Sequence, residues 1–100
     1  MGDLKSVRQV AEDMRTLYTR NFGGKLLGRY KISRDDLKTL AQRSALKIDF
    51  LASLSAELRV EHHLIFISIG DGTSFGVIEE AKVDGWRPVP TRLVKQFAVE

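Results

Sequence analysis

The side chains best able to act on another molecule are basic, and several of them lie close together in the chain. The cluster consists of Arg34, Lys38, Arg43 and Lys47. Guanidinium and ammonium groups in such a cluster favour phosphate contacts, which depend on salt and not on the sequence of the partner. The cluster therefore indicates an anionic partner, although a solvated face that keeps a small protein soluble would have a similar composition.

The charge of the whole chain is distributed in the same way. Residues 1–48 carry 11 Lys or Arg against 5 Asp or Glu, whereas residues 49–100 carry 5 against 8. The net charge of +3 therefore combines a basic first half with an acidic second half. This asymmetry favours nucleic acid as the partner over a surface that is merely solvated.

Catalytic chemistry finds little support in the sequence. Adjacent carboxylates occur at Asp35 and Asp36, in the first turn of an expected helix, and at Glu79 and Glu80, on an expected strand. The first pair suits the positive end of a helix dipole, and neighbours on a strand point to opposite faces. The sequence has no GxSxG, GxGxxG or phosphate-loop motif. We therefore expect that the protein is not an enzyme and uses no cofactor.

His62 and His63 would be the first candidates for a metal site. On the strand expected at residues 62–69 their imidazoles would point in opposite directions, so they could not readily hold one ion together. The chain has no cysteine and no HExxH motif. We therefore expect no bound metal and no disulfide, with one imidazole packed and the other exposed.

The composition is that of a small globular domain. A chain of 100 residues, 43% hydrophobic and 29% charged, is large enough for a single modest core. The longest apolar run, residues 64–70, is too short to cross a bilayer, and the first ten residues lack a signal-peptide core. We expect one domain over residues 1–100, located in the cytoplasm and not in a membrane.

The basic cluster must be positioned by two helices within residues 33–58. Ser33 is a suitable N-cap for the first helix, with Asp36 three residues later. Apolar residues then recur at helical spacing in both helices: Leu37, Leu40 and Ala41, followed by Ile48, Leu51, Leu54 and Leu58. Ser44 and Ala45 are small enough for a tight turn between the two helices, so the segment is typical of a helix-turn-helix.

The segments on either side complete the expected order of elements. They are a helix over residues 3–21, a strand at 29–32, the helix pair within 33–58, a hairpin over 62–83 and a C-terminal segment over 84–100. Asp3 can cap the first helix, and Thr91 can cap a short last helix. The hairpin turns at Gly70–Thr73, where glycine, aspartate and threonine are typical of a tight turn.

This order resembles the winged-helix family of DNA-binding domains. The resemblance covers residues 3–83 and rests on the order of elements and on the pattern LKTLAQRSALKIDFLASL at 37–54. Ala41 takes the place of the small residue of the first helix, and Ala45 that of the usual turn glycine. The apolar places are taken by Leu40, Leu46, Leu51 and Leu54, and Ser44 departs from the pattern. The implied fold is α+β, a winged helix-turn-helix with an extra N-terminal helix, a hairpin wing and a short C-terminal helix.

The resemblance implies a recognition helix in the major groove and a wing against the DNA backbone or minor groove. The outward positions of that helix would be Lys47, Asp49, Ala52, Ser53 and Ala56. Candidate DNA-binding residues are Arg34, Lys38, Arg43, Ser44, Lys47, Ser53 and Thr73. We expect a small DNA-binding protein, either a transcriptional regulator such as a repressor or a partition-type factor of plasmid or phage.

The same helix permits another interpretation. Arg, Asn and Gln, which make bidentate contacts to bases, are missing from its outward positions, and Ala52 and Ala56 would let a second helix approach closely. Trp86 and Arg87 are residue types that anchor protein interfaces, although Trp86 could instead cover the open end of the core. The alternative function is a winged-helix protein-interaction module without DNA binding, with these four residues as its contacts.

The N-terminal helix is longer than a minimal winged helix needs. Met14, Leu17 and Tyr18 could bury against the domain or pair with a second copy. Because small DNA-binding proteins are often twofold dimers that bind two half-sites, we expect a homodimer on duplex DNA.

Overall fold

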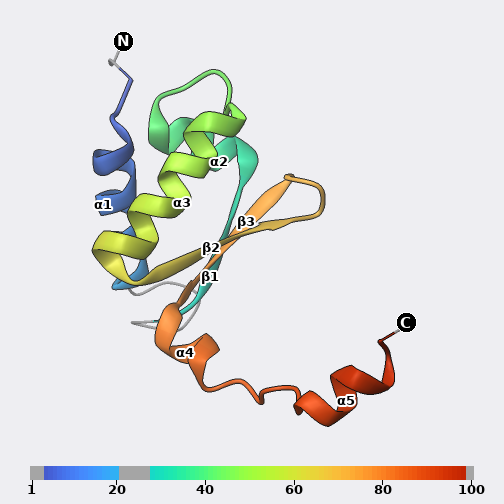
Figure 1. Cartoon of the computed structure of the whole chain (residues 1–100). Coiled ribbons are helices and arrows are strands. Elements are labelled where there is room, and N and C mark those ends of the chain that lie inside the picture. The colour runs from blue at the N-terminus through green and yellow to red at the C-terminus, as the bar shows by residue number, and fades with distance from the viewer. Residues whose placement is uncertain (1–3, 21–27, 99–100) are drawn as a thin grey trace.

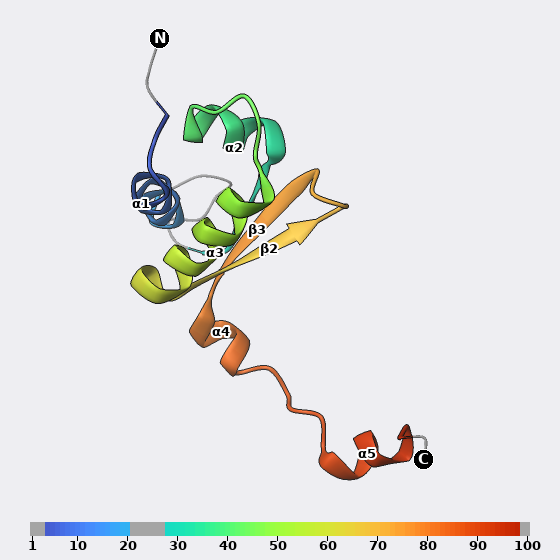
Figure 2. The same cartoon turned by 45° about the horizontal axis from the view of Figure 1, so that its top comes forward.

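The computed structural model describes residues 4–20 and 28–98, and the predicted α+β class is confirmed. In chain order the elements are α1 (Val7–Tyr18), β1 (Tyr30–Ser33), α2 (Arg34–Ala41), α3 (Ile48–His62), β2 (Leu64–Ile69), β3 (Ser74–Glu79), α4 (Glu80–Asp84) and α5 (Thr91–Gln96). The strands form an antiparallel sheet in the order β1-β3-β2. Helices α1, α2 and α3 lie on one side of the sheet, and the segment after α4 leads away from the domain (Figures 1 and 2).

Helix α1 begins later than predicted because of its cap. Ser6 and Gln9 form a capping box, in which Ser6 Oγ accepts from the Gln9 backbone N–H and Gln9 Oε1 accepts from the Ser6 backbone N–H. The predicted start at residue 3 is therefore wrong, and Asp3 itself lies outside the described residues. The helix ends at Tyr18, short of the predicted residue 21.

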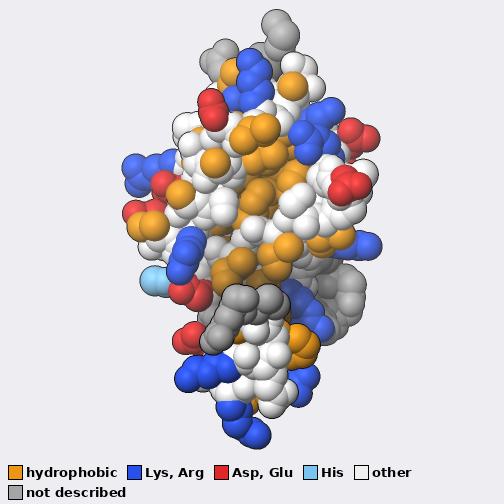
Figure 3. Space-filling view, turned by 45° about the vertical axis from the view of Figure 1, so that its right-hand side comes forward, with side chains coloured by type: hydrophobic (Ala, Val, Ile, Leu, Met, Phe, Trp, Pro, Cys, Tyr) orange, Lys and Arg blue, Asp and Glu red, His pale blue; other side chains and the backbone are white. Residues whose placement is uncertain are grey.

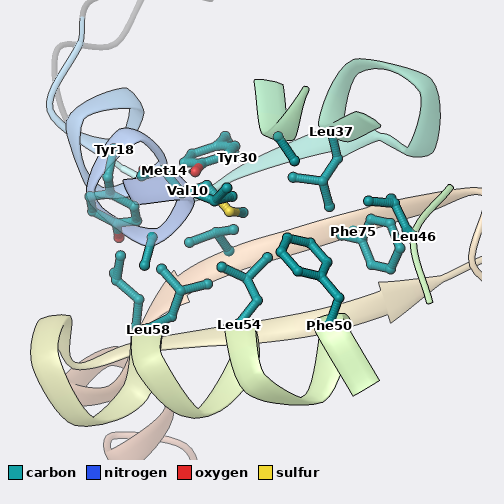
Figure 4. Packing of buried hydrophobic residues seen from close by; sticks show 14 residues of the cluster. Val10, Met14, Tyr18, Tyr30, Leu37, Leu46, Phe50, Leu54, Leu58 and Phe75 are labelled. Carbon is teal, nitrogen blue, oxygen red and sulfur yellow. Dashed lines mark hydrogen bonds between the residues drawn. The ribbon is translucent and has the colours of Figure 1, made fainter. Parts of the chain in front are cut away.

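The core lies between the helices and the inner face of the sheet (Figure 4). Its buried residues are Val10, Ala11, Met14, Tyr18, Tyr30, Leu37, Ala41, Leu46, Phe50, Leu54, Leu58, Leu64, Phe75 and Val77. Burying one large aliphatic or aromatic side chain stabilises a fold by roughly 1.5–3 kcal/mol. Met14 and Tyr18 are part of this core and Leu17 packs against it, so the apolar face of α1 is covered by its own domain.

Helices α2 and α3 are joined by a longer connection than the predicted tight turn. Ser33 caps α2 as predicted, its Oγ accepting from the Asp36 N–H at 3.1 Å. Gln42 then adopts the left-handed conformation, with φ of 56°, and ends the helix, while α3 starts only after Lys47. The Arg43 N–H donates to the Lys38 carbonyl at 2.9 Å and closes the end of α2. The connection therefore spans residues 42–47.

Helix α3 extends past residue 58 to His62, and this extension changes the hairpin. His63, with φ of 55°, is the left-handed residue that ends the helix, so the prediction that both histidines start a strand is wrong. Because β2 begins only at Leu64, the pairing of β2 with β3 ends where Leu64 lies opposite Glu79. Beyond Glu79, β2 has no further residue to pair with, and the chain forms α4 where a strand was predicted.

The hairpin is apolar on both faces. Phe66 and Phe75 stack on the inner face, with ring centroids 4.9 Å apart. Alternation along the strands places the opposite set away from the helices. We call this set the outer sheet face: Ile65, Ile67, Ile69, Gly76 and Ile78.

The C-terminal segment carries two further corrections. Trp86 is 62% exposed, so the interpretation of this side chain as a cover for the core is wrong. Thr91 is the first residue of α5 and not its cap, which is Pro90. Within residues 4–20 and 28–98, no helix combines the length and the apolar character needed to cross a membrane.

Candidate functional site

Arg34, the first residue of α2, is held by carbonyl groups of its own chain. Its Nη1 donates to the Gly72 carbonyl at 3.0 Å, and its Nη2 donates to the Leu46 carbonyl at 2.9 Å. The backbone N–H of Arg34 donates to the Thr73 carbonyl at 2.9 Å, and its guanidinium carbon lies 5.8 Å from the centre of the Phe75 ring. We call this arrangement the Arg34 clamp, because it fixes the start of α2 to the hairpin tip and to the connection before α3.

Arg43 is engaged in a similar way. Its Nη2 donates to the Lys5 carbonyl at 2.9 Å, and its guanidinium carbon lies 4.1 Å from the centre of the Phe50 ring. A cation at that distance from an aromatic face is attracted by the ring. This arginine therefore joins the segment before α1 to the start of α3; the residue is partly exposed, and its Nε is buried.

The two lysines of the predicted cluster, unlike the arginines, do not bind carbonyl groups within the described part of the chain. Lys38 Nζ lies 3.9 Å from Asp35 Oδ1 on the same helix, a surface pair of a kind that contributes little to stability. Lys47 is exposed, and its side chain makes no ion pair within the described part of the chain. Of the four basic residues, the lysines are therefore the ones best placed to meet a phosphate.

The start of α3 offers backbone donors. Lys47 is the N-cap residue and provides no side-chain hydrogen bond, so the first N–H groups of this 15-residue helix have no side-chain acceptor. The positive end of a helix dipole suits an anion. Beside it lies a hollow of about 330 Å³ lined by Leu4, Arg43, Ser44, Ala45, Lys47, Asp49 and Phe50. Arg43, Ser44 and Lys47 thus border one hollow at the turn.

The remaining candidates lie on both sides of this turn. Ser53 is exposed on α3, as predicted, together with Asp49, Ala52 and Ala56. Thr73 is exposed at the hairpin tip, and its Oγ1 donates to the Ile69 carbonyl at 3.4 Å. Because the Arg34 clamp contacts both the hairpin tip and the residue before Lys47, the structure brings the tip and the turn to one end of the molecule.

Acidic side chains share that end. Asp35 and Asp36 lie in the first turn of α2, and Asp49 lies in the first turn of α3. Asp71 is exposed at the hairpin tip. Four carboxylates therefore accompany the four basic residues of the cluster, and the local charge is nearly balanced.

The exposed side of α3 carries an apolar stripe, of which only Ala52 and Ala56 were predicted from the sequence. We call it the α3 stripe: Ile48, Ala52, Ala56 and Val60, at intervals of four residues. Ile48 is 82% exposed and Val60 is 70% exposed. The prediction that Ile48 shares one apolar stripe with Leu54 and Leu58 is wrong, because Phe50 packs in the core with those leucines and a position two residues away lies about 200° around the helix.

A second apolar surface lies on the other side of the sheet. A hollow of about 400 Å³ is lined by Arg29, Tyr30, Lys31, Ile67, Ile69, Gly76, Val77, Ile78 and Trp86. Gly76 forms part of its floor, since a Cβ there would lie 3.3 Å from Ile69 Cδ1. The sequence signal for this surface is the run LIFISI at residues 64–69, in which every residue except Ser68 is apolar, so that both faces of the strand are apolar.

The predicted partner-binding residues are all exposed but do not form one site. Ala52 and Ala56 lie on α3, which covers the inner face of the sheet, whereas Trp86 borders the hollow on the outer face. Arg87 follows in the segment that leaves the domain. On one face of the molecule, hydrophobic side chains form a band with charged side chains around it (Figure 3).

The histidines lie apart from these surfaces, at the end of α3. Among the described residues, no group of three or more histidine, aspartate or glutamate side chains is arranged to hold a metal ion.

Comparisons with known proteins add no relative: no family model, no curated protein and no solved structure matches this chain.

Proposed function

We propose that this chain is a winged-helix domain that binds duplex DNA. The proposed surface consists of the start of α3, the connection at residues 42–47, the hairpin tip Gly70–Thr73 and Lys38 on α2. The observation that carries the proposal is the Arg34 clamp, which holds the hairpin tip against the connection that precedes α3. The order from α1 to β3 is also the order that the winged-helix resemblance predicts.

The dimensions of α3 suit a major groove. Its 15 residues give a length of about 22 Å, and the groove is about 12 Å wide. Small side chains at Ala52, Ser53 and Ala56 would let the helix backbone come close to base edges. Ser53 can hydrogen-bond a base, and the alanines and Ile48 can contact thymine methyl groups.

Affinity would come from a small number of phosphate contacts. Lys38, Lys47 and the free N–H groups at the start of α3 are the available donors, since Arg34 and Arg43 already bind carbonyl groups. With two or three phosphates neutralised, the logarithm of the binding constant should fall with the logarithm of salt concentration with a slope of roughly −2 to −3.

Charge reversal at the lysines tests this surface. Lys47→Glu and Lys38→Glu should each weaken binding to a random duplex at low salt by about tenfold, because each replaces attraction to phosphate with repulsion. Lys82→Glu, on α4, is the matched control and should leave the affinity nearly unchanged. Fluorescence anisotropy of a labelled duplex measures all three, and equal losses in all three variants would show that the surface is wrongly chosen.

A second candidate function, a protein-interaction module, is supported by the α3 stripe. The α3 stripe exposes Ile48 and Val60 with only alanines between them, and rows of residues four apart are the ridges by which helices pack together. A protein-interaction module would bury this stripe against a partner helix. The substitution Val60→Lys, in the stripe but at the end of α3 far from the proposed DNA surface, separates the two functions, because it should abolish packing of a partner helix and should not weaken DNA binding.

A further inference from the structure

The last part of the chain exposes an unusual amount of apolar surface. We call residues 87–98 the C-terminal arm, and its exposed apolar side chains are Val89, Leu93, Val94 and Phe97; Trp86, which precedes the arm, borders the hollow on the outer sheet face. Phe97 is 83% exposed, and α5 has no buried residue. Among the described residues, the hydrogen bonds made by residues 87–98 are local ones, such as that from the Phe97 N–H to the Val94 carbonyl.

The arm is held away from its own domain. Pro88 and Pro90 fix the backbone around Val89 in an extended conformation and cannot donate hydrogen bonds. An extended proline-rich segment advances about 3.1 Å per residue, so it carries α5 outward instead of back over the sheet (Figures 1 and 2). The radius of gyration is 16.4 Å, compared with about 13 Å for a compact domain of this length.

The outer sheet face is the complementary surface in the same chain. Ile67 and Ile69 are each 41% exposed, and between them Gly76 leaves the floor of the hollow without a side chain. No segment within residues 4–20 and 28–98 fills this hollow. Leu93 and Phe97 lie four residues apart on one side of α5 and its end, which suits insertion of both into a single hollow.

We propose that the C-terminal arm of one copy binds the outer sheet face of a second copy, and that the exchange is reciprocal. Each copy would then contribute one arm and one face, which gives a closed twofold dimer. The described residues leave both surfaces uncovered, and each surface is present once per chain, so a reciprocal pair of copies covers every arm and every face. The proline-stiffened connection disfavours the alternative in which each arm folds back on its own sheet.

The area of such a dimer is adequate. A buried aromatic side chain contributes roughly 150–250 Å², and each arm offers Phe97 and three aliphatic residues to a hollow that Trp86 borders. Two arms and two faces together approach the roughly 1,200–2,000 Å² typical of stable interfaces.

Charge gives the dimer a distinctive salt dependence. The hollow is bordered by Arg29 and Lys31, and the arm itself carries Arg87, Arg92 and Lys95. Like charges repel across the contact, and salt screens that repulsion. Dimerisation should therefore tighten as salt rises, which is the opposite of the dependence proposed for DNA binding. The dimer does not rest on the proposed function, since it is measured without DNA.

Light scattering on the full chain tests the proposal. Across the micromolar range, wild type should have the mass of two copies, and Phe97→Asp should raise the dissociation constant at least tenfold. Val60→Asp, equally polar and exposed on α3, is the matched control and should remain dimeric. A monomeric wild type, a dimeric Phe97→Asp variant or loss of the dimer in Val60→Asp would each overturn the proposal.

Disulfide trapping identifies the route of the arm, because the chain has no cysteine of its own. A mixture of Ile67→Cys chains and Phe97→Cys chains should form a disulfide between the two kinds of chain, identified by mass. In the double variant the bond should join two copies, and a bond confined to one chain would mean that the arm folds back on its own sheet. Trp86, the single tryptophan, provides a readout without substitution, since its emission should shift to shorter wavelength as wild type associates.

Discussion

At the scale of single residues, two basic side chains that the sequence suggests for an anionic partner bind backbone carbonyl groups of their own chain instead. Arg34 and Arg43 belong to a basic cluster in the chain, yet their guanidinium groups bind carbonyls of Gly72, Leu46 and Lys5. The cluster itself was evident from spacing. It was not evident which members already bind carbonyl groups, because the acceptors come from three separate segments that meet the arginines only in the folded domain: the hairpin tip, the connection before α3 and the segment before α1.

The Arg34 clamp gives a stability prediction. Arg34→Met should lower the free energy of unfolding by about 2 kcal/mol, because two hydrogen bonds to a charged group are lost and carbonyls are left without partners. Lys47→Met removes a charge of the same sign from an exposed position and should change stability by less than about 0.5 kcal/mol. Urea denaturation measures both, and equal effects would mean that the clamp does not stabilise the fold.

Tyr30 gives a prediction about alkaline pH. Burial raises the pKa of this phenol, whose oxygen donates to the Met14 carbonyl at 2.7 Å. A group with a raised pKa in the folded state contributes its full stability below its unfolded pKa of 10.0, and loses it as pH rises above that value. Unfolding free energy should therefore fall steeply above pH 10.0 in wild type.

Tyr30→Phe is the variant that checks this assignment. It should cost about 1 kcal/mol at neutral pH, through loss of the hydrogen bond, and should make the alkaline fall shallower. Some fall should persist, because burial also raises the pKa of Tyr18. An unchanged alkaline profile in thermal melts of Tyr30→Phe would contradict the role given to Tyr30.

At the scale of elements, the order of helices and strands could be predicted and several boundaries could not. Periodicity placed α1, α2, α3 and the hairpin, since amphipathic helices and strands differ in their repeat. The end of α3 depends on His63 adopting the left-handed conformation, for which a histidine gives no strong sequence signal. That single residue also sets the start of β2, the end of β3 and the presence of α4.

The left-handed end of α3 can be tested directly. His63→Gly should raise the free energy of unfolding by about 0.5–1 kcal/mol, since glycine adopts this conformation without the penalty of a Cβ. Ala52→Gly, in the exposed middle of the same helix, should lower it by about 1 kcal/mol. Thermal or urea unfolding gives both values, and destabilisation by His63→Gly would show that the helix end is misassigned.

At the scale of the whole molecule, apolar surface is distributed in a way that composition does not reveal. The LIFISI run indicates the outer sheet face. The sequence does not indicate that the arm is exposed, because its apolar residues are spaced like those of any packed helix. Whether such a helix packs on its own core depends on the geometry of Pro88 and Pro90, which carries α5 away from the domain.

The exposed arm should be the first target of trypsin. Arg92 lies in α5 with no buried neighbour in that helix, so the bond after it should be cleaved early, whereas the bond after Arg87 is protected by Pro88. If arms are exchanged, cleavage after Arg92 should slow as protein concentration rises. Mass spectrometry of time points measures this, and a cleavage rate independent of concentration would argue against exchange.

The proposed binding of duplex DNA through the start of α3 is tested most directly by titration of a labelled random duplex at several salt concentrations. We predict binding at low salt and a log–log slope of roughly −2 to −3, because two or three phosphates are neutralised. Absence of binding at low salt, or an affinity that does not change with salt, would contradict the account.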